Sequence, residues 1–149
     1  MMDRKPHEKL RDSVKPDRYK NREMITDDVE KHISIDDSRI NEELQDHALH
    51  FRKYTKILSN LQKKAKAIKL KLEEVEATVY VRLSNDGQGR KVKEIDSMIV
   101  LDPEVAKLKR DLLDAEEMVS EYEGIVKALY QRHEMLKDLC ANRRKDLLD

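Results

Sequence analysis

A long apolar repeat between residues 40 and 79 constrains this chain more than any other feature. Apolar or aromatic side chains recur there at alternating spacings of four and three residues for more than five heptads. The members are Ile40, Leu44, His47, Phe51, Tyr54, Leu58, Leu61, Ala65, Ile68, Leu72, Val75 and Val79. Such spacing lines up one stripe along a helix, so the segment predicts an α-helix of about 60–65 Å that packs against another helix.

A second repeat of the same kind occupies the last third of the chain. It follows Asp102, a good capping residue, and Pro103, which suits the first position of a helix. Its members are Val105, Leu108, Leu112, Ala115, Val119, Tyr122, Val126, Leu129, His133, Leu136, Cys140, Arg143 and Leu147. Between the repeats, residues 84–89 hold two of the three glycines of the chain and predict a turn.

Two matched heptad helices around a turn predict an all-α fold, an elongated antiparallel helical hairpin with coiled-coil-like packing. We expect the helices at about residues 36–80 and 102–147, within a domain that spans residues 34–149. Residues 78–100 are rich in β-branched side chains and alternate in part, so a short β-hairpin at the tip is an alternative there.

Composition agrees with an extended helical protein. Charged residues make up 42% of the 149 residues and aromatic residues only 4%. Residues 1–33 contain nine basic and eight acidic residues and few large apolar ones, which predicts a charged N-terminal arm that is disordered or loosely helical, with a short helix over residues 22–31 as an alternative. No apolar run approaches the roughly 20 residues that span a bilayer, and the single Cys140 fits a reducing, cytoplasmic location.

Apolar residues beside the repeats widen each apolar stripe beyond what one partner helix can cover. These residues are Leu49, Ile57, Leu70, Met118 and Ile125. We therefore expect a homo-oligomer.

Basic residues are concentrated on the first predicted helix. Residues 47–72 contain eight Lys or Arg residues and no acidic residue, and further bases surround the turn. Lys and Arg neutralise phosphates, so these residues form a candidate nucleic-acid surface. The candidate DNA-binding residues are Lys63, Lys64, Lys66, Lys69, Lys71, Arg82, Arg90 and Lys91. Alternatively, the basic stripe pairs with the acidic second helix, or with a neighbouring subunit.

No residue pattern indicates catalysis, a metal or a cofactor. The chain lacks a Gly-rich phosphate loop and a nucleophile motif, so we expect no enzyme activity. His47 and His50 lie three residues apart, and His133 falls on the opposite helix. No further ligand marks a zinc site there, so we interpret these histidines as packing residues.

Several short sequence motifs along the chain resemble those of one known family. Residues 35–40 (IDDSRI), with Glu43 three residues on, are similar to the step that opens the first long helix in phage recombination mediators of the UvsY type. Phe51 and Tyr54 fall where that family carries aromatic residues. Glu94-Ile95, Leu101-Asp102 and residues 104–107 (EVAK) resemble its steps ahead of the last helix. The resemblance covers about residues 34–144.

The resemblance implies a non-enzymatic mediator that binds single-stranded DNA and assembles into a ring, a hexamer or heptamer. Its implied partners are a RecA-like recombinase, which it helps to load, and a single-strand-binding protein, which it helps to displace. A phage-encoded protein would act in the host cytoplasm. The family's Leu-Lys-x-Arg step near the tip aligns with residues 76–79 (EATV), which lack a base, so the candidate DNA-binding residues rest on charge clustering alone. The alternative function is a structural or assembly coiled-coil adaptor, a virion or scaffold component, without DNA binding.

Overall fold

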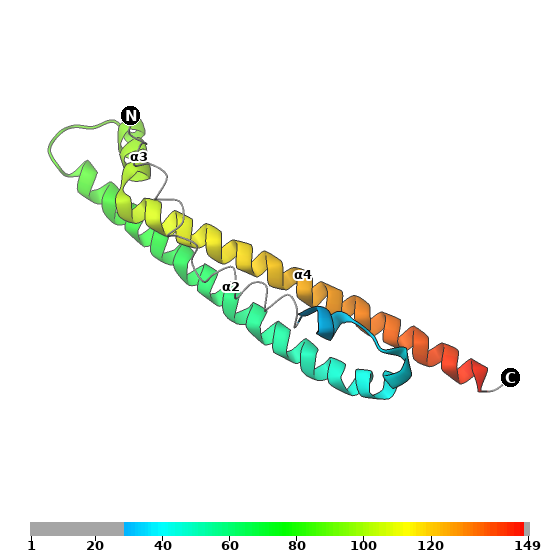
Figure 1. Cartoon of the computed structure of the whole chain (residues 1–149). Helices are drawn as coiled ribbons and strands as arrows, with labels where there is room; N and C mark the ends of the chain where they lie inside the picture. The colour runs from blue at the N-terminus through cyan, green and yellow to red at the C-terminus, as the bar shows by residue number, and fades with distance from the viewer. Residues whose placement is uncertain (1–28, 148–149) are drawn as a thin grey trace, which may run out of the picture.

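The computed structural model describes residues 29–147, which form an elongated antiparallel pair of long helices (Figure 1). The elements are η2 (Asp37–Arg39), α2 (Ile40–Ser84), α3 (Val92–Leu101) and α4 (Pro103–Asp146). α2 has 45 residues and α4 has 44, so each is about 65 Å long at 1.5 Å per residue. The described residues contain no strand. The predicted all-α helical hairpin is therefore confirmed.

The seam between α2 and α4 follows the two apolar repeats. Every member of the repeat at residues 40–79 is buried or half-buried, and so are the members of the second repeat from Val105 to Cys140. Arg143 and Leu147 are exposed, so the seam ends earlier than the second repeat predicts. Within the described residues, no helix is both long and apolar enough to cross a membrane.

Two buried clusters hold the helices together at different positions along the hairpin. Tyr54, Tyr122 and Leu129 belong to one cluster, and Leu72, Val79 and Val105 belong to the other. Leu129 and Leu136 are fully buried, and burial of such a side chain contributes about 1.5–3 kcal/mol. Between the clusters, seam residues such as Ala65 and Ile68 are only half-buried. The seam is therefore less covered between the two clusters than within them.

Side-chain caps fix where the helices begin. The Asp36 carboxylate accepts hydrogen bonds from the Ser38 backbone N–H at 3.0 Å and the Ser38 hydroxyl at 2.6 Å, which starts η2. α2 then begins at Ile40, four residues later than predicted. The Asp102 carboxylate accepts from the N–H of Glu104 at 3.0 Å and that of Val105 at 3.3 Å. This cap, with Pro103 at the first position, starts α4 as predicted.

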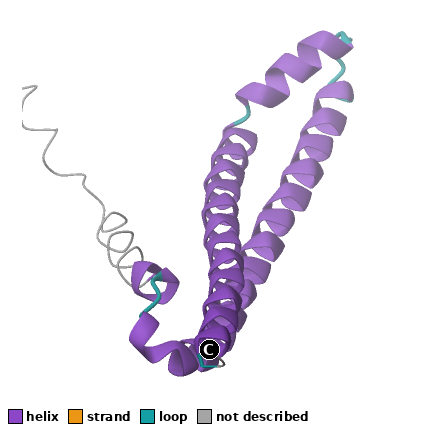
Figure 2. Cartoon of the chain, turned by 90° about the vertical axis from the view of Figure 1, so that its right-hand side faces the viewer, coloured by secondary structure: helices purple, strands orange, loops and turns teal. Residues whose placement is uncertain are grey.

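The β-hairpin alternative for residues 78–100 is wrong. α2 continues to Ser84, residues 85–91 form the loop, and α3 follows as a separate short helix that joins the far ends of α2 and α4 (Figure 2). Val79 packs with Val105 in a buried cluster, and the exposed fraction of Ile95 on α3 is only 3%. Burial of these residues on helical faces outweighs the preference of β-branched side chains for strands.

The chain immediately before η2 folds back onto the hairpin. Residues 29–33 are helical, Val29 belongs to the Tyr54 cluster, and Ile33 packs against it. These five residues are helical and packed, whereas the sequence predicts a disordered or loosely helical arm over residues 1–33. Residues 1–28 of that arm lie outside the described residues.

Candidate nucleic-acid interface

The candidate lysines on α2 lie on its solvent-exposed surface. Lys63, Lys64, Lys66, Lys69 and Lys71 are all exposed. Among the described residues, none of the five forms an ion pair. No direct ion pair to α4 therefore neutralises these charges within the described part of the chain.

Helical spacing separates these lysines into two sides of α2. Lys64 and Lys71 are seven residues apart, almost two turns, so they share one flank, while Lys63 points about 100° away from Lys64, toward the outer face of α2. The same arithmetic places Lys53 and Lys56 on this side. We call the five lysines on this side the outer stripe: Lys53, Lys56, Lys63, Lys64 and Lys71. Residues 53–71 contain no acid, so the outer stripe is uniformly basic.

Lys66 and Lys69 occupy the opposite flank of α2. They line an open groove of about 400 Å³ between α2 and α4, together with Leu70, Glu73, Glu116 and two seam residues. Two carboxylates in the same groove offset the two ammonium groups. The groove is therefore a weaker candidate for phosphate binding than the outer stripe.

The three candidate bases near the tip are differently placed. The Arg82 guanidinium forms an ion pair of 3.3 Å with Asp102, and Arg90 forms an ion pair with Asp86 within the loop. Lys91 is exposed just before α3. The structure thus does not gather the eight candidate residues on one surface: five lie along α2, and three lie around the tip.

Charge pairing between the helices uses other residues. Lys109 on α4 pairs with Glu76 on α2 at 3.1 Å, and Arg143 pairs with Asp37 at 3.7 Å. Both contacts join a base of α4 to an acid of the N-terminal half of the hairpin. In the alternative, bases of α2 pair with acids of α4. Among the described ion pairs only Arg82 with Asp102, the N-cap residue of α4, has that direction, and none involves a candidate lysine.

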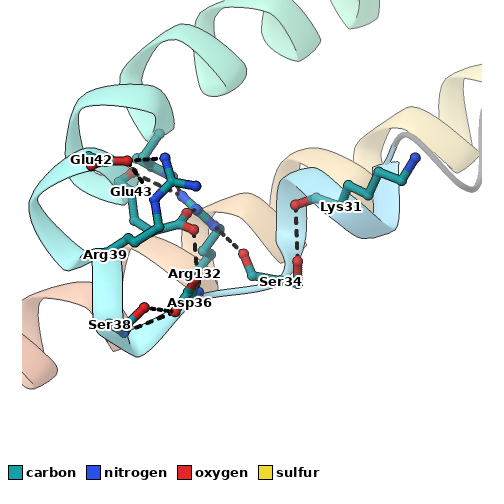
Figure 3. A network of polar contacts seen from close by, with 9 residues as sticks. Lys31, Ser34, Asp36, Ser38, Arg39, Glu42, Glu43 and Arg132 are labelled. Carbon is teal, nitrogen blue, oxygen red and sulfur yellow. Dashed lines mark hydrogen bonds and ion pairs between the residues drawn. The ribbon is translucent and has the colours of Figure 1, made fainter.

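The most buried charge of the described residues is Arg132 on α4, with 2% of its side chain exposed. It forms an ion pair with Glu43 of α2, and its Nη1 lies 3.1 Å from Nδ1 of His47. Its Nε donates to the backbone oxygen of Ser34 at 3.4 Å (Figure 3). Arg132 therefore ties α4 both to α2 and to the segment that precedes η2.

Histidines surround this arginine in two stacked pairs. The rings of His47 and His133 have centroids 5.2 Å apart, and those of His32 and His50 are 3.9 Å apart. Burial lowers the pKa of His47, and the charge of Arg132 lowers it further. The described residues contain no cluster of three or more His, Cys, Asp or Glu side chains that could hold a metal ion.

Arg132 was not predicted from the sequence. The second repeat places His133 in the seam, but an α-helix has 3.6 residues per turn, so a strict heptad drifts and the neighbouring position also turns inward. Leu129, Arg132 and Leu136 keep the three–four spacing and are all buried. This alternative spacing, with Glu43 opposite, is the sequence signal that could have indicated a buried ion pair.

The fold was compared with known proteins. No protein-family model matches the chain, and no curated protein matches it by sequence. Solved structures of the bacteriophage T4 recombination mediator protein UvsY do match. One crystal form has a TM-score of 0.69 and 16% identity and covers 83% of this chain and 97% of UvsY. A second has a TM-score of 0.68 and 17% identity, with 84% and 96% covered. The resemblance noted in the residues is thus confirmed at the level of structure, and the chain has the UvsY fold.

Proposed function

We propose that this protein is a recombination mediator that binds single-stranded DNA and helps to load a RecA-like recombinase onto strand covered by single-strand-binding protein. The observation that carries the proposal is the UvsY fold, which extends over 97% of a solved recombination mediator. The mediator role in UvsY, together with the family steps in the sequence, gives this chain its proposed place in recombination. No covalent step is required of it.

The outer stripe is the proposed DNA-binding surface. Its five lysines are exposed along about four to five turns of a rigid helix, and none has an ion-pair partner among the described residues. A row of unneutralised ammonium groups suits a phosphate backbone, because binding releases condensed counterions. Sequence-independent contact of this kind is what a mediator needs on strand of any sequence.

Assembly multiplies this surface. Exposed apolar side chains remain on both long helices, with Leu49, Leu70 and Leu113 each more than half exposed. We propose that such residues pack between subunits of a homo-oligomer, a hexamer or heptamer as in the family that the sequence resembles. A ring would present several outer stripes to one strand, and multivalent contact strengthens weak individual sites.

Charge reversal tests the proposed surface. The variant K63E/K64E/K71E should weaken binding to labelled oligo-dT by about tenfold or more in fluorescence anisotropy at low salt, because three phosphate contacts become repulsive. The control K107E/K127E/K145E makes the same change in net charge at exposed positions of α4. It should bind much more tightly than the stripe variant.

Equal weakening in both variants would show a general effect of net charge and would remove the outer stripe as the site. A wild-type protein that binds neither oligo-dT nor duplex would favour the structural adaptor. Circular dichroism of each variant must show unchanged helicity, since all six lysines are exposed and outside the seam.

A further inference from the structure

The segment before η2 is held to the hairpin by a compact group of ionisable side chains. We call residues 29–34 the docked segment. Its contacts are the His32–His50 stack, a 2.9 Å hydrogen bond between His32 Nδ1 and the Tyr54 hydroxyl, and the bond from Arg132 to the Ser34 carbonyl. Val29 adds an apolar contact in the Tyr54 cluster. Most of the polar contacts therefore involve a histidine or a residue that bonds one.

The direction of one hydrogen bond fixes the charge state of His47. A guanidinium can only donate, so Nδ1 of His47 must accept the bond from Arg132 Nη1. Nδ1 therefore carries a lone pair and the imidazole is neutral. A proton on Nδ1 would set two donors and two positive charges against each other at 3.1 Å. Arg132 could then not keep its present position between His47 and Ser34.

The His32–His50 stack is also sensitive to protonation. Its ring planes lie at 25° and their centroids are 3.9 Å apart. Two imidazolium rings at this distance repel each other, whereas two neutral rings, or one neutral and one charged, can stack. Acidification therefore acts against the docked segment at both of its anchors.

We propose that these histidines and Arg132 form a pH-operated latch, which holds the docked segment at neutral pH and releases it in mild acid. Release uncovers the apolar surface on which Val29 rests, including the Tyr54–Tyr122 pair, whose ring centroids are 6.4 Å apart. The end of the hairpin around Leu72, Val79 and Val105 stays closed, since that cluster contains no ionisable group.

The charges around the latch set the pH range. Burial, Arg132, His133 and His50 all lower the pKa of His47. Burial, Arg132 and Lys53 lower the pKa of His50, while Asp46 and Glu43 oppose that change, and the balance is downward. A proton on either ring acts against a contact of the docked segment, because His50 stacks on His32 and the arginine that bonds His47 also bonds Ser34. Docking therefore weakens in mild acid, below the ordinary pKa of a histidine, because the pKa of both rings is lowered.

Hydrogen exchange of the Ser34 amide tests the latch, because this N–H donates to the Glu30 carbonyl at 2.9 Å only in the docked helical turn. Protection factors, which correct for the intrinsic pH dependence of exchange, are compared at pH 7.5 and 5.5. In the wild-type protein they should fall about tenfold for each pKa unit by which docking lowers the histidine pKa values. Amides of α4 near Val105 in the same sample should keep their protection and serve as the internal control.

The variant H47N/H50N separates titration from packing. The side-chain oxygen of Asn occupies nearly the place of Nδ1 and can accept the Arg132 bond, but it does not titrate. In this variant Ser34 should keep the same protection at both pH values. Unchanged protection in the wild-type protein, or an equal loss in the variant, would overturn the proposal.

A second measurement covers the case in which the variant fails to fold at pH 7.5. NMR titration of the histidine ring carbons in the wild-type protein gives the pKa of His47 directly. Titration of His47 over the same pH range in which Ser34 loses protection supports the latch, and loss of Ser34 protection over a range in which His47 does not titrate overturns it.

Discussion

At the scale of single residues, Arg132 is the most buried charged side chain of the described structure. Its guanidinium contacts Glu43, His47 and the Ser34 carbonyl, which belong to two different segments. A buried ion pair of this kind adds little over a well-packed apolar pair, but removing one partner leaves a charge without compensation. Its contribution is therefore to fix one register of α4 against α2.

Truncation of this side chain should be costly. We expect R132A to lower the free energy of unfolding by about 3 kcal/mol, since Glu43 and His47 lose their partner and a cavity forms. The control R143A removes an arginine whose side chain is 50% exposed and should cost less than about 1 kcal/mol. Urea unfolding followed by circular dichroism measures both, and equal small losses would contradict the role given to Arg132.

Stability should also depend on pH through His47. Its pKa is lower in the folded than in the unfolded protein, so the unfolded chain binds more protons between the two values. The free energy of unfolding therefore falls as the pH drops from about 6.5 toward the folded pKa and then levels off. H47N should flatten this part of the profile in urea titrations, and an identical profile would refute the assignment.

At the scale of elements, the long helices could be predicted because one physical rule, burial of a stripe at four–three spacing, governs their whole length. α3 could not be predicted, since Val92 to Val100 suit a strand locally and only burial of Ile95 against the long helices decides for a helix. The basic residues of α2 were identified, but their division between the outer stripe and the groove required the helix geometry.

Acidic side chains in the seam should disrupt the hairpin. Leu61 and Ile68 are members of the buried stripe, so L61D/I68D places two carboxylates against α4 and should abolish most of the helicity. N60D/A67D introduces the same two carboxylates at the same spacing on exposed positions and should keep it. Far-UV circular dichroism compares the helix content of the two variants. Full helicity in L61D/I68D would contradict the packing of Leu61 and Ile68 against α4.

Replacing glycine by alanine should change the free energy of unfolding in opposite directions in the loop and in the helix. Gly87 has φ of 75°, where a Cβ is strained, so G87A should destabilise by about 1 kcal/mol. Gly124 lies inside α4 with no atom within 4 Å of an added Cβ, so G124A should stabilise by about 0.5–1 kcal/mol. Thermal unfolding of both variants checks the loop and the helix together.

At the scale of the whole molecule, an elongated hairpin with no enclosed site among its described residues suits binding along a polymer. The chain has the fold of the recombination mediator UvsY, and the outer stripe is the proposed surface for phosphates. Half-exposed leucines on both helices supply a surface for assembly. Shape, charge and apolar surface are therefore consistent with the proposed multivalent DNA-binding assembly.

The most direct test of the central claim is an anisotropy titration of the wild-type protein with labelled oligo-dT and with a duplex of equal length across a salt series. The account predicts preference for the single strand, with the logarithm of affinity falling linearly with the logarithm of salt concentration at about 0.7 per phosphate contacted. Absence of binding, or equal binding to both forms, would contradict it.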